Sequence, residues 1–353
     1  MIDTIKTNSS YYARKVENAL EAAKVRALTT MQKVQFINTY VLPKLTYVSR
    51  IFKLEKSALK RINQMTYKFI WRHNLEKLAW KEIINPVKEG GMGAIDLETK
   101  CNALFLKTSL KHLFQDPPSI ETRYLDYFIG LSLAKFKTPL KGPHAESTPQ
   151  CLSNTMSLVS EITDLKPDQN LQTMTAKDIC KLLVNKITLR PKILKKNENN
   201  QLFYECCKTL NTQILTPNTK DVNFLRIHNI LTTKYSLYKC NQSADEKCKW
   251  CGDKEDAKHL IECPASLEAL RWLRLKTLDH SRYLKPSNND FFYLNLPPDK
   301  PKLIILTAEW HRALFMARKA NAKSIVETVI QKLEKKRKIW EPGKARIKKQ
   351  KHE

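Results

Sequence analysis

The sequence predicts a mainly α-helical protein that combines a helical bundle, a small zinc-binding module of the CCHC type and a basic helical tail. Apolar residues recur at helical spacing in the first seventy positions and again after position 300. Between these two regions, one short segment gathers three cysteines and a histidine. We expect five segments, which cover residues 1–75, 76–115, 116–222, 223–285 and 286–353.

Two helices are predicted in the first segment, because their apolar residues lie mostly three or four positions apart and so share one face. Pro43 is expected to end the first helix, since an interior proline removes a hydrogen bond and clashes with the preceding turn. We expect the two helices to pack antiparallel. The first apolar stripe is Val16, Leu20, Ala23, Ala27, Met31, Val34 and Val41. The second is Leu59, Ile62, Met65 and Phe69, with Lys56, Lys60, Arg61 and Lys68 mostly on the other side.

A tight turn is expected in PVKEGGMG (86–93), which holds three of the seven glycines of the chain. Asp96 can cap a following helix, and the apolar spacing over residues 97–108 predicts that helix. The third segment is less regular. It contains one predicted helix over 179–187 and a predicted solvated linker over 192–201.

The charge of the chain indicates a polyanionic partner. Lysine and arginine number 62 against 35 aspartates and glutamates, so the net charge is +27. We favour nucleic acid over a membrane surface, because no apolar run of 18 residues, lipidation motif or charged-then-apolar leader is apparent. Nine cysteines without a secretory signal indicate metal ligands or free thiols. We therefore expect an intracellular protein of the nucleus and cytoplasm.

The segment CKWCGDKEDAKHLIEC (248–263) is the strongest chemical signal. Cys248 and Cys251 have the C-x2-C spacing with which a tight turn directs two thiolates at one ion, and Gly252 relieves that turn. His259 and Cys263 are four residues apart, on one face of a helix. Because four ligands leave no open position, the sequence predicts one structural zinc ion held by these four side chains.

Two other interpretations of this segment are open. The spacing can arise by chance among nine cysteines and eight histidines. A catalytic zinc ion is also conceivable, but it would need an open coordination position and a nearby general base. Cys240 lies close enough to compete as a ligand, although we expect it not to bind the metal.

The region after position 300 predicts an amphipathic helix followed by a basic tail. The helix is indicated by Leu303, Leu306, Trp310, Leu314, Met316 and Ala317, continued by Ile325, Val329 and Leu333. Residues 332–351 hold ten basic and two acidic residues. This charge fits an arm that binds nucleic acid, a nuclear-import signal or a solvated run. The candidate contacts in this tail are Lys335, Lys336, Arg337 and Lys338.

Two sets of motifs resemble the C-terminal part of the reverse transcriptase of LINE-type (non-LTR) retrotransposons. The first set is LPKLTY (42–47), FIW (69–71) and PVKEGGMGAIDL (86–97), in that order. The second is the C-x2-C, HL and CP pattern of 248–264, which is similar to the zinc-binding region of those enzymes. The resemblance covers about residues 11–110 and 222–335.

The resemblance implies that residues 11–71 form a thumb-like bundle that grips a nucleic-acid duplex, and that the zinc region contacts nucleic acid during target-primed reverse transcription. The implied thumb contacts are Lys44, Arg50, Lys60, Arg61, Lys68, Arg72 and His73. Those around the zinc site are Lys249, Trp250, Lys254, Lys258, Arg271 and Arg274. Lys249 and Trp250 lie between the two cysteines of the turn, where side chains point away from the metal, so we expect both to be exposed. Trp71 is a candidate stacking platform, although its place at the end of an apolar stripe favours the core.

A reverse transcriptase needs paired aspartates to hold two metal ions, and the sequence contains no Asp-Asp pair. We therefore expect no polymerase palm, no endonuclease and no catalytic residue. The sequence predicts a non-catalytic, zinc-containing nucleic-acid-binding protein derived from such an enzyme. Two alternatives are an accessory part of an active polymerase, whose palm lies on another product and would be a partner, and a decayed copy without function.

Overall fold

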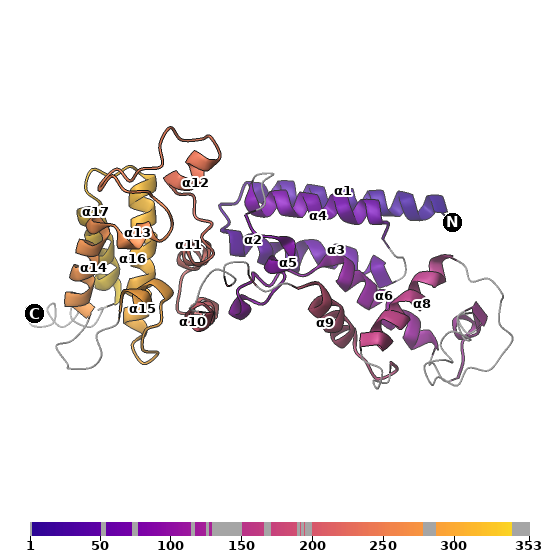
Figure 1. Cartoon of the computed structure of the whole chain (residues 1–353). Coiled ribbons are helices and arrows are strands. Elements are labelled where there is room, and N and C mark those ends of the chain that lie inside the picture. The colour runs from indigo at the N-terminus through magenta and orange to yellow at the C-terminus, as the bar shows by residue number, and fades with distance from the viewer. Residues whose placement is uncertain are drawn as a thin grey trace, which may run out of the picture. The chain divides into compact units, whose positions relative to one another are not determined.

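The computed structural model of the chain describes residues 2–50, 54–72, 77–113, 117–124, 127–128, 150–165, 171–188, 191, 194, 200–277 and 287–340. It confirms the mainly α-helical prediction (Figure 1). The described residues form no β-strand, and their one isolated bridge joins Lys247 to Lys254. None of the helices in this part of the chain is long and apolar enough to span a membrane.

The chain forms two compact units. Unit 1 consists of Met1–Asn85 and Gly93–Leu189, and unit 2 consists of Pro86–Met92 and Arg190–Glu353. The grouping differs from the five predicted segments, because predicted segments 223–285 and 286–353 share one hydrophobic core. Helical periodicity marks each element but does not say which elements pack together.

Unit 1 is a bundle of helices, and one of its buried clusters joins α6, α8 and α9. Its helices are α1 (Ile2–Lys24), α2 (Thr30–Phe36), a π-helical turn (Ile37–Val41), α3 (Leu42–Thr46), a 3-10 turn (Val48–Arg50), α4 (Lys56–Trp71), α5 (Trp80–Ile83), α6 (Leu97–Leu113), α8 (Gln150–Leu165) and α9 (Ala176–Ile187). Helix α9 confirms the helix predicted over 179–187, and α6 confirms the one predicted over 97–108. The predicted linker over 192–201 lies mostly outside the described residues.

The predicted antiparallel pairing in unit 1 is wrong, because α1 and α4 run in the same direction. Ser9 Oγ accepts a hydrogen bond from the backbone of Glu55 at 3.3 Å. Further along both helices, Glu17 pairs with Arg61 at 2.9 Å. After α1 the chain runs back through α2 and α3, so that α4 has the same direction as α1 (Figure 1).

The first predicted helix is also interrupted, since Thr29 starts α2 with a capping box to Gln32. The prediction that Pro43 ends a helix is wrong, because this proline lies in the first turn of α3. The π-helical turn directly before it, in which the N–H of Leu42 donates to the carbonyl of Ile37, already interrupts the regular pattern of helix hydrogen bonds that a proline would break. Asp96 caps α6 as predicted, by accepting a hydrogen bond from the backbone of Thr99 at 3.0 Å.

The glycine-rich segment 86–93 forms the expected tight turn. Gly90 has a φ of 86°, in the left-handed region that favours glycine. A Cβ atom on Gly90 would also lie 2.7 Å from the ring of Phe203, which is fully buried in unit 2. Both constraints require glycine at this position.

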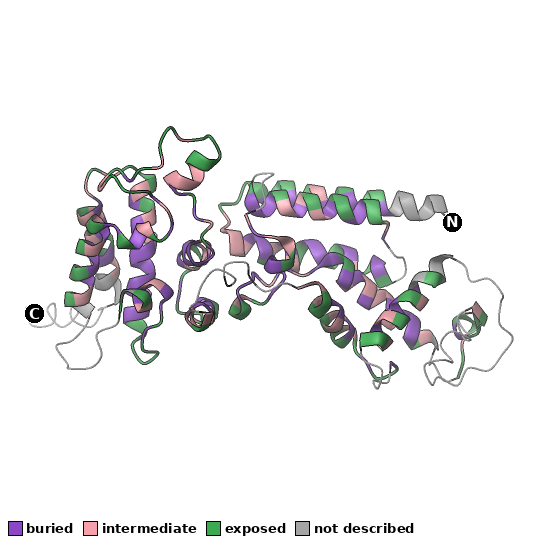
Figure 2. Ribbon diagram, viewed as in Figure 1, coloured by how far each residue is buried: buried purple, intermediate pink, exposed green. Residues whose placement is uncertain are grey.

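Unit 2 is built around one long buried helix. Its elements are a 3-10 turn (Val87–Glu89), α10 (Asn200–Asn211), α11 (Pro217–Ile227), α12 (Lys234–Lys239), α13 (His259–Glu262), α14 (Pro264–Thr277), α15 (Asn288–Tyr293), α16 (Pro301–Lys319) and α17 (Ile325–Trp340). Figure 2 shows that α16 is buried over much of its length. The predicted stripe on α16 and α17 is buried, except for Met316, which is 39% exposed.

A buried polar network joins α16 to α11. Asn223 Nδ2 donates to the carbonyl of Ala308 at 3.1 Å, and Asn223 Oδ1 lies 2.7 Å from His311 Nδ1. Complete burial lowers the pKa of His311 well below its usual value, so this imidazole is neutral. The network fixes α16, whose C-terminal end reaches the cysteine and histidine cluster.

Candidate metal centre

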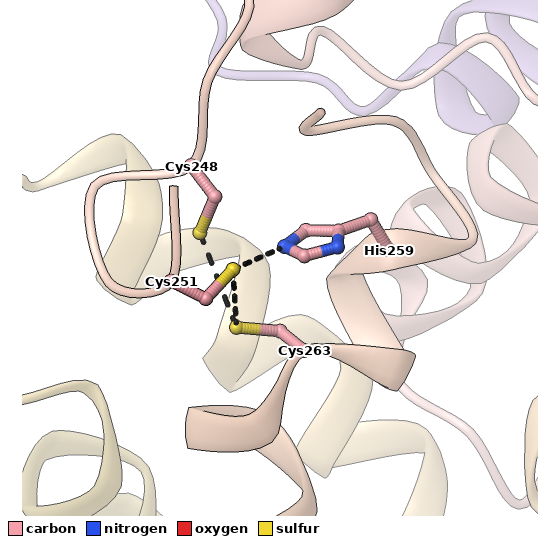
Figure 3. Close-up of side chains that lie close together, drawn as sticks. All are labelled: Cys248, Cys251, His259 and Cys263. Carbon is pink, nitrogen blue, oxygen red and sulfur yellow. Dashed lines mark hydrogen bonds between the residues drawn. The ribbon is translucent and has the colours of Figure 1, made fainter. Parts of the chain in front are cut away.

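The four residues predicted to bind zinc converge in unit 2 (Figure 3). Cys248 and Cys251 come from a turn, His259 is the first residue of α13, and Cys263 directly follows that helix. Their potential ligand atoms all lie within 4.8 Å of one another. The cluster can hold one metal ion.

The distances within the cluster fit tetrahedral coordination. Cys263 Sγ lies 3.9 Å from Cys248 Sγ and 3.7 Å from Cys251 Sγ. A tetrahedral zinc ion with Zn–S bonds of ~2.3 Å would separate two sulfurs by about 3.8 Å. The same sulfur atoms are much too far apart for a disulfide, whose S–S bond is about 2.05 Å.

The turn that carries the first two cysteines is closed by backbone hydrogen bonds. The N–H of Cys248 donates to the carbonyl of Asp253 at 2.6 Å, and the N–H of Gly252 donates to the carbonyl of Cys248 at 2.9 Å. Gly252 has a φ of 82°, which an L-residue with a side chain rarely adopts. The prediction that Gly252 relieves this turn is confirmed.

Helix α13 positions the other two side chains. The Asp256 carboxylate accepts a hydrogen bond from the backbone of His259 at 2.7 Å. The N–H of Cys263 donates to the carbonyl of His259 at 2.9 Å, which places the two residues one turn apart on the same side. The Nε2 atom of His259 faces Cys251 Sγ at 3.2 Å. Pro264 then begins α14 and separates it from α13.

The environment of the thiols favours a bound cation. Burial opposes ionisation of Cys248, but backbone N–H donors of the turn, together with His259 and Arg318, lower the pKa of this thiol to about 6. Burial and the neighbouring thiols raise the pKa of Cys251 to about 12. Several thiolates cannot share one site without a positive charge that balances them, and a metal ion provides that charge.

Arg318 on α16 forms an outer shell that the sequence did not predict. Its Nη1 atom lies 3.4 Å from Cys248 Sγ and 2.9 Å from Glu255 Oε2. The guanidinium also lies over the ring of Trp250, 5.0 Å from its centroid. The Arg318 and Glu255 side chains are only 5% and 9% exposed. A divalent ion with three thiolates and one imidazole carries a net charge of −1, which this arginine offsets.

The donor set fits a structural zinc ion. Three sulfurs and one imidazole nitrogen complete a four-coordinate shell, so no position is left for water or a substrate. This closed shell supports a structural role and disfavours the catalytic alternative. Cys240 is exposed and lies outside the cluster, in agreement with the expectation that it does not bind metal.

Trp250 is not the exposed side chain that the sequence predicted. Its ring is partly buried against the core of unit 2 and lies under Arg318. Its position between the two cysteines suggested exposure, but α16 covers the turn. The ring therefore stabilises the metal module and is not available to stack on a base.

Most of the predicted nucleic-acid contacts near the metal centre have partners within unit 2. The contacts are Lys249 with Asn321 (2.9 Å), Lys254 with the ring of Tyr235 (3.6 Å), Lys258 with Glu262 (3.4 Å), Arg274 with the ring of Phe291 (4.8 Å) and Lys336 with Glu309 (3.8 Å). Arg271 and Lys335 are exposed, and no described group pairs with them. The side chains of Arg337 and Lys338 lie outside the described residues.

The predicted contacts of unit 1 are more accessible. Arg61 pairs with Glu17, and both side chains are largely exposed. Five other predicted contacts are exposed and pair with no carboxylate in the described part of the chain. We call these five the open cations of unit 1: Lys44, Arg50, Lys60, Lys68 and Arg72. Trp71 is 5% exposed and belongs to the core, which the sequence favoured over a role in base stacking. His73 lies outside the described residues.

Comparison with known proteins identifies no relative: no protein-family model matches the chain, and no curated protein shows significant similarity to it.

Proposed function

We propose that the protein is a non-catalytic nucleic-acid-binding protein that holds one structural zinc ion and derives from a LINE-type reverse transcriptase. The derivation is supported by the two motif sets around positions 42–97 and 248–264, which occur in the order typical of those enzymes. The proposed partner is nucleic acid. If the protein is an accessory part of an active polymerase, the remainder of that polymerase is a second partner. The compartment that fits such a protein is the nucleus and cytoplasm.

The distribution of charge carries the nucleic-acid part of the proposal. Residues 30–72 contain nine basic residues and one acidic residue, a net charge of +8. All five open cations of unit 1 belong to this region. Clustered, unpaired lysine and arginine side chains neutralise phosphates and release counterions, which is the main source of non-specific affinity for nucleic acid.

The zinc ion has a structural role in this proposal. Residues 240–264 contain four basic and six acidic residues, a net charge of −2. A metal module of this charge attracts phosphate weakly by itself. Its closed ligand shell and its contact with α16 support a role in folding unit 2.

A salt titration tests the nucleic-acid part. Fluorescence anisotropy with a labelled duplex is measured from about 50 to 200 mM salt. We expect log affinity to fall linearly with log salt, with a slope of roughly 0.9 for each neutralised phosphate, hence about four to five for the open cations alone. Binding that does not change with salt, or no binding, would overturn the proposal.

The non-catalytic part has its own test. Because the sequence lacks paired aspartates for two catalytic metal ions, the purified chain should not extend a primed template. Primer extension by the clean protein would contradict this part of the proposal alone.

A further inference from the structure

Unit 1 contains a groove between α1 and the segment from α3 to the following 3-10 turn. Its volume is about 600 Å³, within the range of roughly 300–1,000 Å³ that is typical of ligand sites. It is lined by Tyr12, Lys15, Asn18, Ala19, Lys44, Tyr47 and Val48. Tyr12, Lys15 and Ala19 lie three and four positions apart, so they share one side of α1. This side lies next to the apolar stripe of α1 that is buried in the bundle.

The groove combines an apolar base with cations and aromatic rings. Val48 is 7% exposed and forms part of the bundle core. Tyr47, which follows α3, is 72% exposed. Lys15 and Lys44 are exposed, and no described carboxylate lines the groove.

This combination distinguishes between anionic ligands. Phosphate groups would be attracted by the two lysines alone, as would the carboxylates of an acidic peptide. An exposed tyrosine ring adds a surface for a planar base, and base–aromatic stacking occurs with all four bases. In a duplex the base faces are already stacked on their neighbours, so only an unpaired strand can use such a ring.

We propose that this groove binds a single-stranded segment of nucleic acid, with a base stacked on Tyr47 and phosphates near Lys15 and Lys44. The inference rests on the proposed nucleic-acid binding and adds where an unpaired strand is held. Asn18 at the groove supplies donors and an acceptor for a base edge, so a weak preference among bases is compatible with the site.

The test compares two exposed tyrosines of the same region. Tyr47→Ala removes a ring that lines the groove, and Tyr40→Ala removes a ring that is 62% exposed, stacks on Phe36 and lies outside the groove. We expect Tyr47→Ala to weaken binding of a short single-stranded oligonucleotide about 5- to 100-fold, while Tyr40→Ala has little effect. Tyr47→Phe should keep most of the affinity because it keeps the ring.

A second measurement shows whether a substitution has damaged the fold of the protein as a whole. The affinity of each variant for a duplex is measured in parallel, and Tyr47→Ala should leave it within about twofold, since a stacked duplex does not use the ring. Photocrosslinking of a thiouridine-containing strand to the unmodified protein should label peptides that contain residues 11–19 or 44–48.

The outcomes separate this inference from the proposed function. If the intact protein binds neither duplex nor single strand, both fail. If it binds the duplex but Tyr47→Ala and Tyr40→Ala bind the single strand equally well, the groove assignment is wrong and the proposed function stands. Competition by polyglutamate as strong as that by the single strand would identify the groove as an acidic-peptide site instead.

Discussion

Residues 30–72 of unit 1 and residues 240–264 of unit 2 both present exposed lysines, yet their net charges are +8 and −2. In unit 1, the five open cations have no described acidic partner. In unit 2, Lys249, Lys258 and Arg318 contact acceptors of their own unit. Basic residues beside a metal centre are therefore not by themselves a surface for nucleic acid, because they also offset the charge of the thiolates and carboxylates around them.

The two units also differ in what holds them together. The described part of unit 1 relies on apolar packing, with Val16, Leu45 and Ile62 almost completely buried. Unit 2 has a comparable apolar core but adds a cluster of three cysteines and a histidine linked through Arg318 to α16. Loss of metal should therefore affect one unit and spare the other.

The largest effect is expected from Cys251→Ser. With one ligand removed, the zinc content should fall from about one ion per chain to near zero, because four ligands are needed for a closed tetrahedral site. Metal analysis measures the content, and hydrogen exchange should show lost protection around residues 246–263 but not in α4. Cys240→Ser is the matched control and should keep its zinc. Equal zinc content in the two variants would show that the cluster is not the metal site.

A smaller loss is expected from Arg318→Met, which removes the outer-shell donor to Cys248. Zinc affinity, measured by competition with a chromophoric chelator, should fall about 10- to 100-fold. The zinc affinity of Arg318→Lys should lie between those of the unmodified protein and Arg318→Met, because lysine keeps the positive charge but lacks the planar guanidinium.

Two variants separate this effect from general damage. Arg312→Met removes a half-buried arginine of the same helix that pairs with Glu309 and should leave zinc affinity unchanged. Adding Glu255→Gln to Arg318→Met avoids leaving a buried carboxylate unpaired. If Arg318→Met binds zinc as tightly as Arg312→Met does, Arg318 has no role in holding the metal.

The comparison between the units is tested by two pairs of charge removals. Lys60→Gln with Lys68→Gln should reduce duplex affinity and lower the salt slope by about 1.8, without changing zinc content. Lys254→Gln with Lys258→Gln should have a smaller effect, because those lysines lie against Tyr235 and Glu262. A larger loss from the second pair would reverse the assignment of the binding surface.

The smallest effect is expected from removal of residues 341–353, which contain five basic and two acidic residues. The deletion spares Leu333, which is buried in unit 2. The salt slope should fall by a few units at most, since each phosphate that the tail neutralises adds roughly 0.9 to it. Complete loss of duplex binding, measured by anisotropy, would mean that the tail and not unit 1 is the main site.

Local features of the fold and the site could be predicted from the sequence. The cap at Asp96, the buried stripe of α16 and the four clustered ligands each depend on spacing over a few residues. Periodicity and capping chemistry act over that distance, so a single sequence is enough to identify them.

The features that were missed depend on residues far apart in the chain. The parallel course of α1 and α4 depends on the return of the chain through residues 30–46. Arg318 reaches Cys248 from a different helix, and the same helix covers Trp250. Helical spacing identifies an apolar face but not the partner that covers it.

The central claim is that open cations of unit 1, and not the lysines around the metal centre, bind nucleic acid. Lysine acylation footprinting with mass spectrometry tests this directly, by comparing the modification of each lysine in the intact, zinc-loaded protein with and without duplex. We expect Lys44, Lys60 and Lys68 to be protected by the duplex, while Lys249, Lys254 and Lys258 react equally in both states. Protection of the second set without protection of the first would contradict the account.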